Sequence, residues 1–185
     1  MTSTARRSPR LPLFPKDTTV NSAGHLEIGG CDAFDLAREY GTPLYVFDEG
    51  TLRQQCREFV ERFSARYPDT MVCYASKAFL NRAMAQLVKE AGLGLDVVSI
   101  GEFAIARSVD FPSERVYFHG NNKLPDELAQ ALDWGVGRIV VDNMYELQLL
   151  DTLARERSTV QQILLRVTPN VDPHTHEFTT TGVLD

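Results

Sequence analysis

Apolar and polar positions alternate along this chain in two rhythms, one typical of strands and the other of helices. After residue 48, short apolar runs are separated by longer stretches in which apolar residues recur every third or fourth position. The runs predict strands over residues 70–75, 94–98, 115–118, 138–141 and 161–167. The stretches predict helices over residues 49–67, 80–91, 102–108, 125–134 and 145–157. This alternation predicts a parallel sheet whose strands are joined by right-handed helical crossovers.

The predicted strands are apolar at consecutive positions, which is typical of a sheet that is covered on both faces. No Gly-x-Gly-x-x-Gly motif follows the first of them, so a dinucleotide-binding fold is not supported. The remaining α/β architecture is a (β/α)8 barrel of the TIM type, which needs about 250 residues. Five βα units make a partial barrel, and the sequence ends in a polar loop at Asp185. We therefore expect this chain to be the N-terminal part of a longer protein.

The first 48 residues follow a different pattern. Residues 1–24 predict a disordered or extended lead-in, and residues 25–28 predict a short strand that a glycine pair ends. Asp32 is a suitable N-cap for a predicted helix over residues 33–40, and residues 43–47 predict a further strand. We expect three parts, which are the lead-in (1–24), an N-terminal segment (25–48) and the incomplete barrel (49–185).

Composition and charge narrow the possible functions. The sequence is 43% hydrophobic and 24% charged, and its net charge of −6 argues against a nucleic-acid-binding surface. No run of 18 apolar residues is present, so no membrane span is predicted. The three cysteines are widely spaced and form no Cys-x-x-Cys pair, which argues against a disulfide framework or a structural zinc site. A reducing, cytoplasmic setting is the simplest explanation.

Polar and ionisable side chains follow every predicted strand of the barrel, at the end where such barrels keep their active sites. Lys77 follows the first strand and is a candidate for a buried amine that forms a Schiff base, because burial lowers a lysine pKa and makes the amine nucleophilic. The competing interpretation is a lysine at a strand end with a buried stem and a solvated head. Asp96 and Arg166 lie within apolar strands, where a charge needs a partner or a ligand.

Two other polar pairs are better explained without a ligand. Asp142 and Asn143 follow the fourth barrel strand, where they can cap the next helix. His174 and His176 would share a face of an extended segment, but no carboxylate or cysteine cluster accompanies them. We interpret them as loop histidines and expect no metal site.

Several motifs, in this order and spacing, resemble the bacterial diaminopimelate decarboxylases. These enzymes use pyridoxal 5′-phosphate and have the alanine racemase-like barrel, known as fold type III. The motifs are Gly41-Thr-Pro-Leu-Tyr-Val-Phe-Asp48, Tyr74-Ala-Ser-Lys-Ala-Phe79, Gly92-Leu-Gly-Leu-Asp-Val-Val-Ser99, His119-Gly-Asn-Asn-Lys123, Leu165-Arg-Val-Thr-Pro-Asn170 and Asp172-Pro-His-Thr-His-Glu-Phe178. The resemblance covers nearly the whole chain, with one departure at Ile100, where the family usually has a glycine.

The resemblance implies that Lys77 carries pyridoxal 5′-phosphate. If a test were to exclude Lys77, Lys89 and Lys123 would be the nearest alternatives. It also implies that Asp96 lies close to that lysine, that Arg166 lines the cofactor pocket, and that His119 and Asn121 lie near the cofactor ring. The expected reaction is the decarboxylation of meso-2,6-diaminopimelate to L-lysine by a cytoplasmic homodimer. The strand over residues 43–47 would join a C-terminal β-domain that this chain lacks.

Three other interpretations stay open at this point. One is another fold-type III decarboxylase that acts on arginine or ornithine. The second is a non-catalytic barrel that binds the cofactor, although the long lead-in argues against it. The third is an inert fragment, since five strands leave an open sheet edge. Because the resemblance places the phosphate cradle and the partner-donated cysteine beyond Asp185, we expect the 185-residue chain to be inactive by itself.

Overall fold

The chain folds as two units, residues 1–70 and 71–185, in the computed structural model, which describes residues 11–171 and 174. We call them the N-terminal unit and the C-terminal unit. The expected division after residue 48 stays a prediction, and the basic tail over residues 1–10 lies outside the described residues.

The N-terminal unit contains a small antiparallel sheet. A short 3-10 helix, Leu11–Leu13, precedes β1 (Thr19–Val20), β2 (Leu26–Ile28) and β3 (Cys31–Asp32), which pair in that order. The strand expected over residues 25–28 is therefore present, while β1 lies within the segment expected to be a lead-in. Gly29 and Gly30 connect β2 to β3 and both have positive φ angles, as a two-residue hairpin turn requires.

Two helices follow, α1 (Ala33–Tyr40) and α2 (Glu49–Ser64). Asp32 caps α1 as expected, since its side chain accepts hydrogen bonds from the backbone N–H groups of Phe34 and Asp35. The strand predicted over residues 43–47 does not form. A strand needs a hydrogen-bonded neighbour, and the three described strands of this unit pair only with one another.

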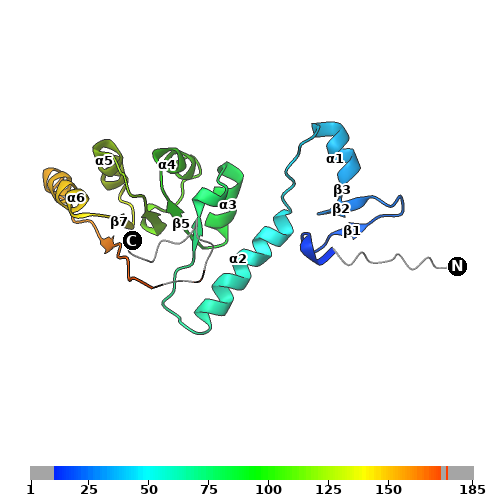
Figure 1. Ribbon diagram of the computed structural model, residues 1–185, viewed down its shortest axis with the longest axis horizontal. Helices are drawn as coiled ribbons and strands as arrows, with labels where there is room; N and C mark the ends of the chain where they lie inside the picture. The colour runs from blue at the N-terminus through cyan, green and yellow to red at the C-terminus, as the bar shows by residue number, and fades with distance from the viewer. Residues whose placement is uncertain (1–10, 172–173, 175–185) are drawn as a thin grey trace. The chain divides into compact units, whose positions relative to one another are not determined.

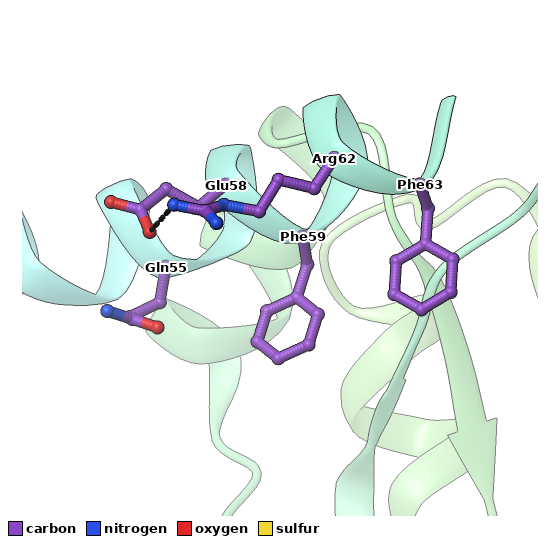
Figure 2. Close-up of a pocket in the computed structure, with 5 residues that line it drawn as sticks. All are labelled: Gln55, Glu58, Phe59, Arg62 and Phe63. Atoms are coloured by element: carbon purple, nitrogen blue, oxygen red, sulfur yellow. Dashed lines mark ion pairs between the residues drawn. The ribbon is translucent and has the colours of Figure 1, made fainter. Parts of the chain in front are cut away.

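Helix α2 is less buried than its periodicity predicts. Cys56, Phe59 and Phe63 recur at helical spacing, yet only Cys56 is buried, whereas Phe59 and Phe63 are about half exposed. Figure 2 shows both aromatic rings on the same side of the helix, beside an ion pair in which Arg62 Nη2 lies 3.6 Å from Glu58 Oε2. The helical period was correct, but periodicity alone does not show whether another element covers the apolar face.

The C-terminal unit contains a five-stranded parallel sheet. Its strands are β4 (Cys73–Ala75), β5 (Gly94–Val97), β6 (Val116–Phe118), β7 (Arg138–Val141) and β8 (Ile163–Leu165). They lie in sequential order, so β4 and β8 are the edge strands. Between them come the helices α3 (Arg82–Glu90), α4 (Ile100–Arg107), α5 (Pro125–Trp134) and α6 (Met144–Glu156), with short 3-10 turns at Ser76–Ala78 and Ser113–Arg115. This confirms the predicted α/β fold, a partial (β/α)8 barrel.

The four helices are started by polar caps or by proline. Asn81, Ser99 and Asn143 accept hydrogen bonds from backbone N–H groups in the first turns of α3, α4 and α6. Pro125 occupies the first turn of α5, where its missing N–H costs no helical hydrogen bond. Gly135 then ends α5 in the left-handed conformation, with φ +71°.

The two faces of the parallel sheet differ in composition. Figure 1 shows α3, α4, α5 and α6 side by side along one face. The strand residues on that face are buried and apolar: Leu95, Val97, Val116, Phe118, Ile139 and Val141. Phe103 from α4 packs edge-on against Phe118, with ring centroids 4.6 Å apart. We call the opposite face the open face.

The open face carries polar side chains. The register aligns Ala75, Asp96, Tyr117 and Arg138 across four neighbouring strands, and side chains in one such row share a face. Arg138 Nη1 donates to the Tyr117 hydroxyl at 2.7 Å, and its guanidinium lies 5.4 Å from the centre of that ring. A site at the strand ends of this unit would therefore lie next to the polar side chains of the open face.

Candidate functional site

Lys77 lies in the turn that follows β4, at the carboxyl end of the sheet. The turn is fixed on either side of the lysine, because Ser76 is buried and the Tyr74 hydroxyl donates to the Phe79 carbonyl at 2.7 Å. Lys77 itself is exposed, so the expected buried amine is wrong for this structure. The physical reason is that the turn follows edge strand β4, which among the described strands has a neighbour on one side only.

Asp96 lies near the end of β5, next to β4, with a half-buried side chain. Its Oδ1 atom is buried and has no hydrogen-bond partner among the described residues. Burial raises the pKa of this carboxyl group, while the nearby His119 and Lys77 lower it in part. The Lys77 and Asp96 side chains therefore interact electrostatically, and the role that the resemblance implies for this pair stays a prediction.

His119 continues the line of β6 beyond its last residue. Its backbone N–H donates to the Val97 carbonyl at 2.8 Å, and its imidazole Nε2 lies 3.6 Å from Asp96 Oδ1. Asn121, two residues further, is exposed. No hydrogen bond or ion pair joins Asn121 to Lys77, Asp96 or His119 within the part of the chain that the structure describes.

Arg166 follows β8, at the opposite edge of the sheet from Lys77. Its side chain is 46% exposed, so it is not the buried charge that the apolar sequence around it predicted. Its Nη1 atom lies 3.4 Å from Asp142 Oδ1. Asp142 therefore pairs with Arg166, and of the two residues expected to cap α6 only Asn143 does so.

The sequence reasoning missed a buried ion pair beside this site. Lys123 Nζ lies 2.8 Å from Glu146 Oε1, and the two side chains are 1% and 5% exposed. The sequence offered one signal for this pair. Glu146 lies in the first turn of a predicted helix, and Lys123 ends the motif that follows an earlier strand. The same contacts bear on the alternative cofactor lysines, because Lys123 is buried in an ion pair and the Lys89 ammonium donates to the Val109 carbonyl at 2.7 Å.

The described residues contain no group of three or more His, Cys, Asp or Glu side chains placed to hold a metal ion. His174 is exposed, and His176 lies outside the described residues. None of the described helices combines the length and the apolar character that crossing a membrane requires.

The arrangement at the ends of β4, β5 and β6 has a defined chemical capacity. An exposed primary amine, a carboxylate and an imidazole come from three neighbouring strands and interact electrostatically. A lysine amine can add to an aldehyde or ketone, and a nearby carboxylate stabilises the positive charge of the resulting nitrogen. These three residues therefore suit covalent capture of a carbonyl compound.

Comparison with known proteins gives a consistent result. The family model described as the pyridoxal binding domain of pyridoxal-dependent decarboxylases matches residues 49–185. A diaminopimelate decarboxylase of Bacillus subtilis (strain 168) is 51% identical over 165 residues, which are 89% of this chain and 38% of that protein. The enzyme of the same name from Bacillus methanolicus is 49% identical over 93% of this chain and 40% of its own length.

A solved structure supports the same relationship. The diaminopimelate decarboxylase of M. jannaschii, crystallised in co-complex with L-lysine, superposes with a TM-score of 0.77 and 33% sequence identity. The superposition covers 88% of this chain and 38% of that one. The chain thus spans about two fifths of the length of the relatives it matches.

Proposed function

Because the chain belongs to the family of pyridoxal-dependent decarboxylases, through their pyridoxal binding domain, we propose that it forms the cofactor-binding part of a diaminopimelate decarboxylase. The proposed reaction is the decarboxylation of meso-2,6-diaminopimelate to L-lysine. The observation that carries this proposal is the 51% identity to the Bacillus subtilis enzyme over 89% of the chain. Since the match covers 38% of that enzyme, we propose that the chain acts as part of a longer polypeptide.

The residues of the site fit pyridoxal phosphate. Asp96 Oδ1 is a buried oxygen that has no hydrogen-bond partner among the described residues, and a positively charged neighbour stabilises such a carboxylate. When bound, the cofactor supplies a conjugated ring that takes up the electron pair released with carbon dioxide. Lys77 would hold the cofactor through its Nζ atom, and Asp96 would balance the positive charge beside it.

The other predicted residues have supporting roles in this proposal. His119 would interact with the Asp96 carboxylate, because its imidazole Nε2 lies 3.6 Å from Oδ1. Asn121 would lie near the cofactor ring, and Arg166 would supply a positive charge from the end of β8. The exposure of Asn121 and Arg166 leaves both side chains able to contact a ligand.

Two further features belong to the proposal for the whole enzyme. We infer a cytoplasmic location, supported by three free cysteines, Cys31, Cys56 and Cys73. We also infer a homodimer, supported by the family resemblance of the sequence motifs. Sedimentation of the full-length enzyme tests this inference, since a monomeric mass at micromolar concentration would contradict it.

Borohydride trapping tests the role of Lys77. The chain is incubated with pyridoxal phosphate, the lysine–cofactor bond is reduced, and the labelled peptide is identified by mass spectrometry. Of the four lysines in the sequence, we expect the label on Lys77. The label should be lost in Lys77→Ala and kept in Lys89→Ala, which removes a lysine outside the site. Labelling that persists in Lys77→Ala would overturn the assignment.

A further inference from the structure

Lys123 and Glu146 form a buried charged pair that the proposed chemistry does not use. Lys123 lies at the end of the loop that follows β6, and Glu146 lies in the first turn of α6. Lysine and glutamate are rarely buried to this degree unless they are paired, and these side chains are only 1% and 5% exposed. Their burial beside the strand ends therefore calls for an explanation.

The Lys123 ammonium makes two hydrogen bonds and one ion pair. It donates to the Gly120 carbonyl at 2.5 Å and to the Val140 carbonyl at 2.8 Å, and it lies 2.8 Å from Glu146 Oε1. It also lies 5.6 Å from the centre of the Phe118 ring. One side chain thus joins the loop, strand β7 and helix α6.

This contact fixes the loop that carries His119. Gly120 has a φ angle of +117°, a conformation that residues with a side chain rarely adopt, and its carbonyl meets the Lys123 ammonium. The pairing of β6 with β7 ends at Phe118 and Ile139, and Lys123 binds the carbonyl of the next residue, Val140. The Lys123 side chain therefore attaches the loop to β7 directly after the last residue pair between β6 and β7.

Stability alone does not explain the pair. Replacing a buried ion pair with apolar residues of similar volume is often neutral or stabilising, because the charges lose their hydration when they are buried. We propose that Lys123 and Glu146 are positioning residues: they clamp residues 119–122 to β7 and α6, so that His119 stays beside Asp96. The clamp proposal rests on the proposed function in one respect, because it takes His119 and Asp96 to be part of the pyridoxal phosphate site.

The test is a double variant, Lys123→Met with Glu146→Leu, which removes both charges and keeps the volume. The matched control is Arg155→Met with Asp151→Leu, because Arg155 Nε lies 2.8 Å from Asp151 Oδ2 on the exposed side of the same helix. Thermal unfolding should show that both double variants fold. The informative readouts are the backbone dynamics of the loop and cofactor capture by Lys77.

In the clamp variant, we expect the NMR order parameters of residues 120–122 to fall from about 0.85 to below about 0.6. The His119 amide, which donates to the Val97 carbonyl, should exchange its proton faster, while the core amides of Leu95 and Val97 keep their rates. The pyridoxal phosphate concentration that gives half-maximal trapping at Lys77 should rise roughly tenfold, comparable to losing an outer-shell partner of a metal ligand. The control should change none of these quantities.

Unchanged loop dynamics in a folded clamp variant would overturn the proposal, and so would a loosened loop with unchanged trapping. If the double variant does not fold, Glu146→Gln replaces it, because this variant removes only the counter-charge and should loosen the same loop. A chain whose Lys77 is never trapped would contradict the proposed function, whereas the loop dynamics would still decide whether the clamp exists.

Discussion

At the scale of single residues, Asp96 shows how the burial of a charge in the candidate site lowers stability. Burial raises its pKa in the folded chain, with partial compensation from His119 and Lys77. A carboxyl group whose pKa is raised on folding is bound to a proton more readily in the folded state, so stability falls as the pH rises through the folded pKa. The proposed chemistry needs the ionised Asp96 carboxylate, and the folded chain is less stable with this group ionised than with it protonated.

This predicts opposite effects of Asp96→Asn on stability and on cofactor binding. At pH 7 the variant should unfold at a higher temperature than the wild-type chain, because asparagine carries no charge to bury. The difference should vanish near pH 3, where the aspartate is protonated in both states. Cofactor trapping at Lys77 should weaken in the same variant. Calorimetry at the two pH values checks this, and a variant less stable than wild type at pH 7 would contradict it.

Asp32 shows the opposite behaviour in the N-terminal unit. Burial raises its pKa, but hydrogen bonds from His25, Asn21 and the backbone of Phe34 and Asp35 outweigh this effect and lower it to about 2. The stability that its charge contributes is complete above the unfolded value of 3.8 and is lost as the pH falls through about 2.

The Phe34 amide reports this titration directly, because it donates to Asp32 Oδ1 at 2.8 Å. We expect its NMR chemical shift to titrate with a midpoint of about 2. In Asp32→Asn, which retains an oxygen that can cap α1 but cannot titrate, the shift should stay constant over the same range. A midpoint near 3.8 in the wild-type chain would show that these hydrogen bonds do not form in solution.

At the scale of secondary-structure elements, central and edge strands should respond differently to the same substitution. Leu95 lies in β5 and is fully buried, whereas Leu165 lies in edge strand β8 and is 63% exposed. Leu95→Ala should lower the free energy of unfolding by about 3 kcal/mol, since it leaves a cavity in the core. Leu165→Ala should change it by less than about 0.5 kcal/mol. Urea unfolding measures both, and equal losses would contradict the assignment of β8 as an exposed edge.

The bounds of helices and strands were more predictable from the sequence than the burial of their residues. The strand over Arg138–Val141 and the helix over Pro125–Trp134 have the predicted bounds, because apolar runs, proline and glycine act locally. The exposure of Lys77 and Phe63 was not predictable in the same way, since burial depends on what packs against a residue. The Lys123–Glu146 pair joins residues 23 positions apart, and no periodic pattern predicts such a contact.

At the scale of the whole molecule, the described site lies on an open sheet. Lys77 and Arg166 follow edge strands β4 and β8, each of which pairs with a single neighbour in the part of the chain that the structure describes. The chain also spans about two fifths of the length of its relatives. We therefore expect the purified 185-residue chain to release no carbon dioxide from meso-diaminopimelate, even when Lys77 captures the cofactor. Radiolabelled carbon dioxide release measures this, and activity above that of Lys77→Ala would contradict it.

The row of Ala75, Asp96, Tyr117 and Arg138 also limits how such a gene can change length. Side chains alternate between the two faces of a strand, so one additional codon within β5 would turn Asp96 toward the helices and Val97 toward the polar face. A single in-frame insertion there would bury a charge and expose a core residue at the same time. Length changes among functional descendants of this gene should therefore be found in the connections between elements, while β5 and β6 accept substitutions only.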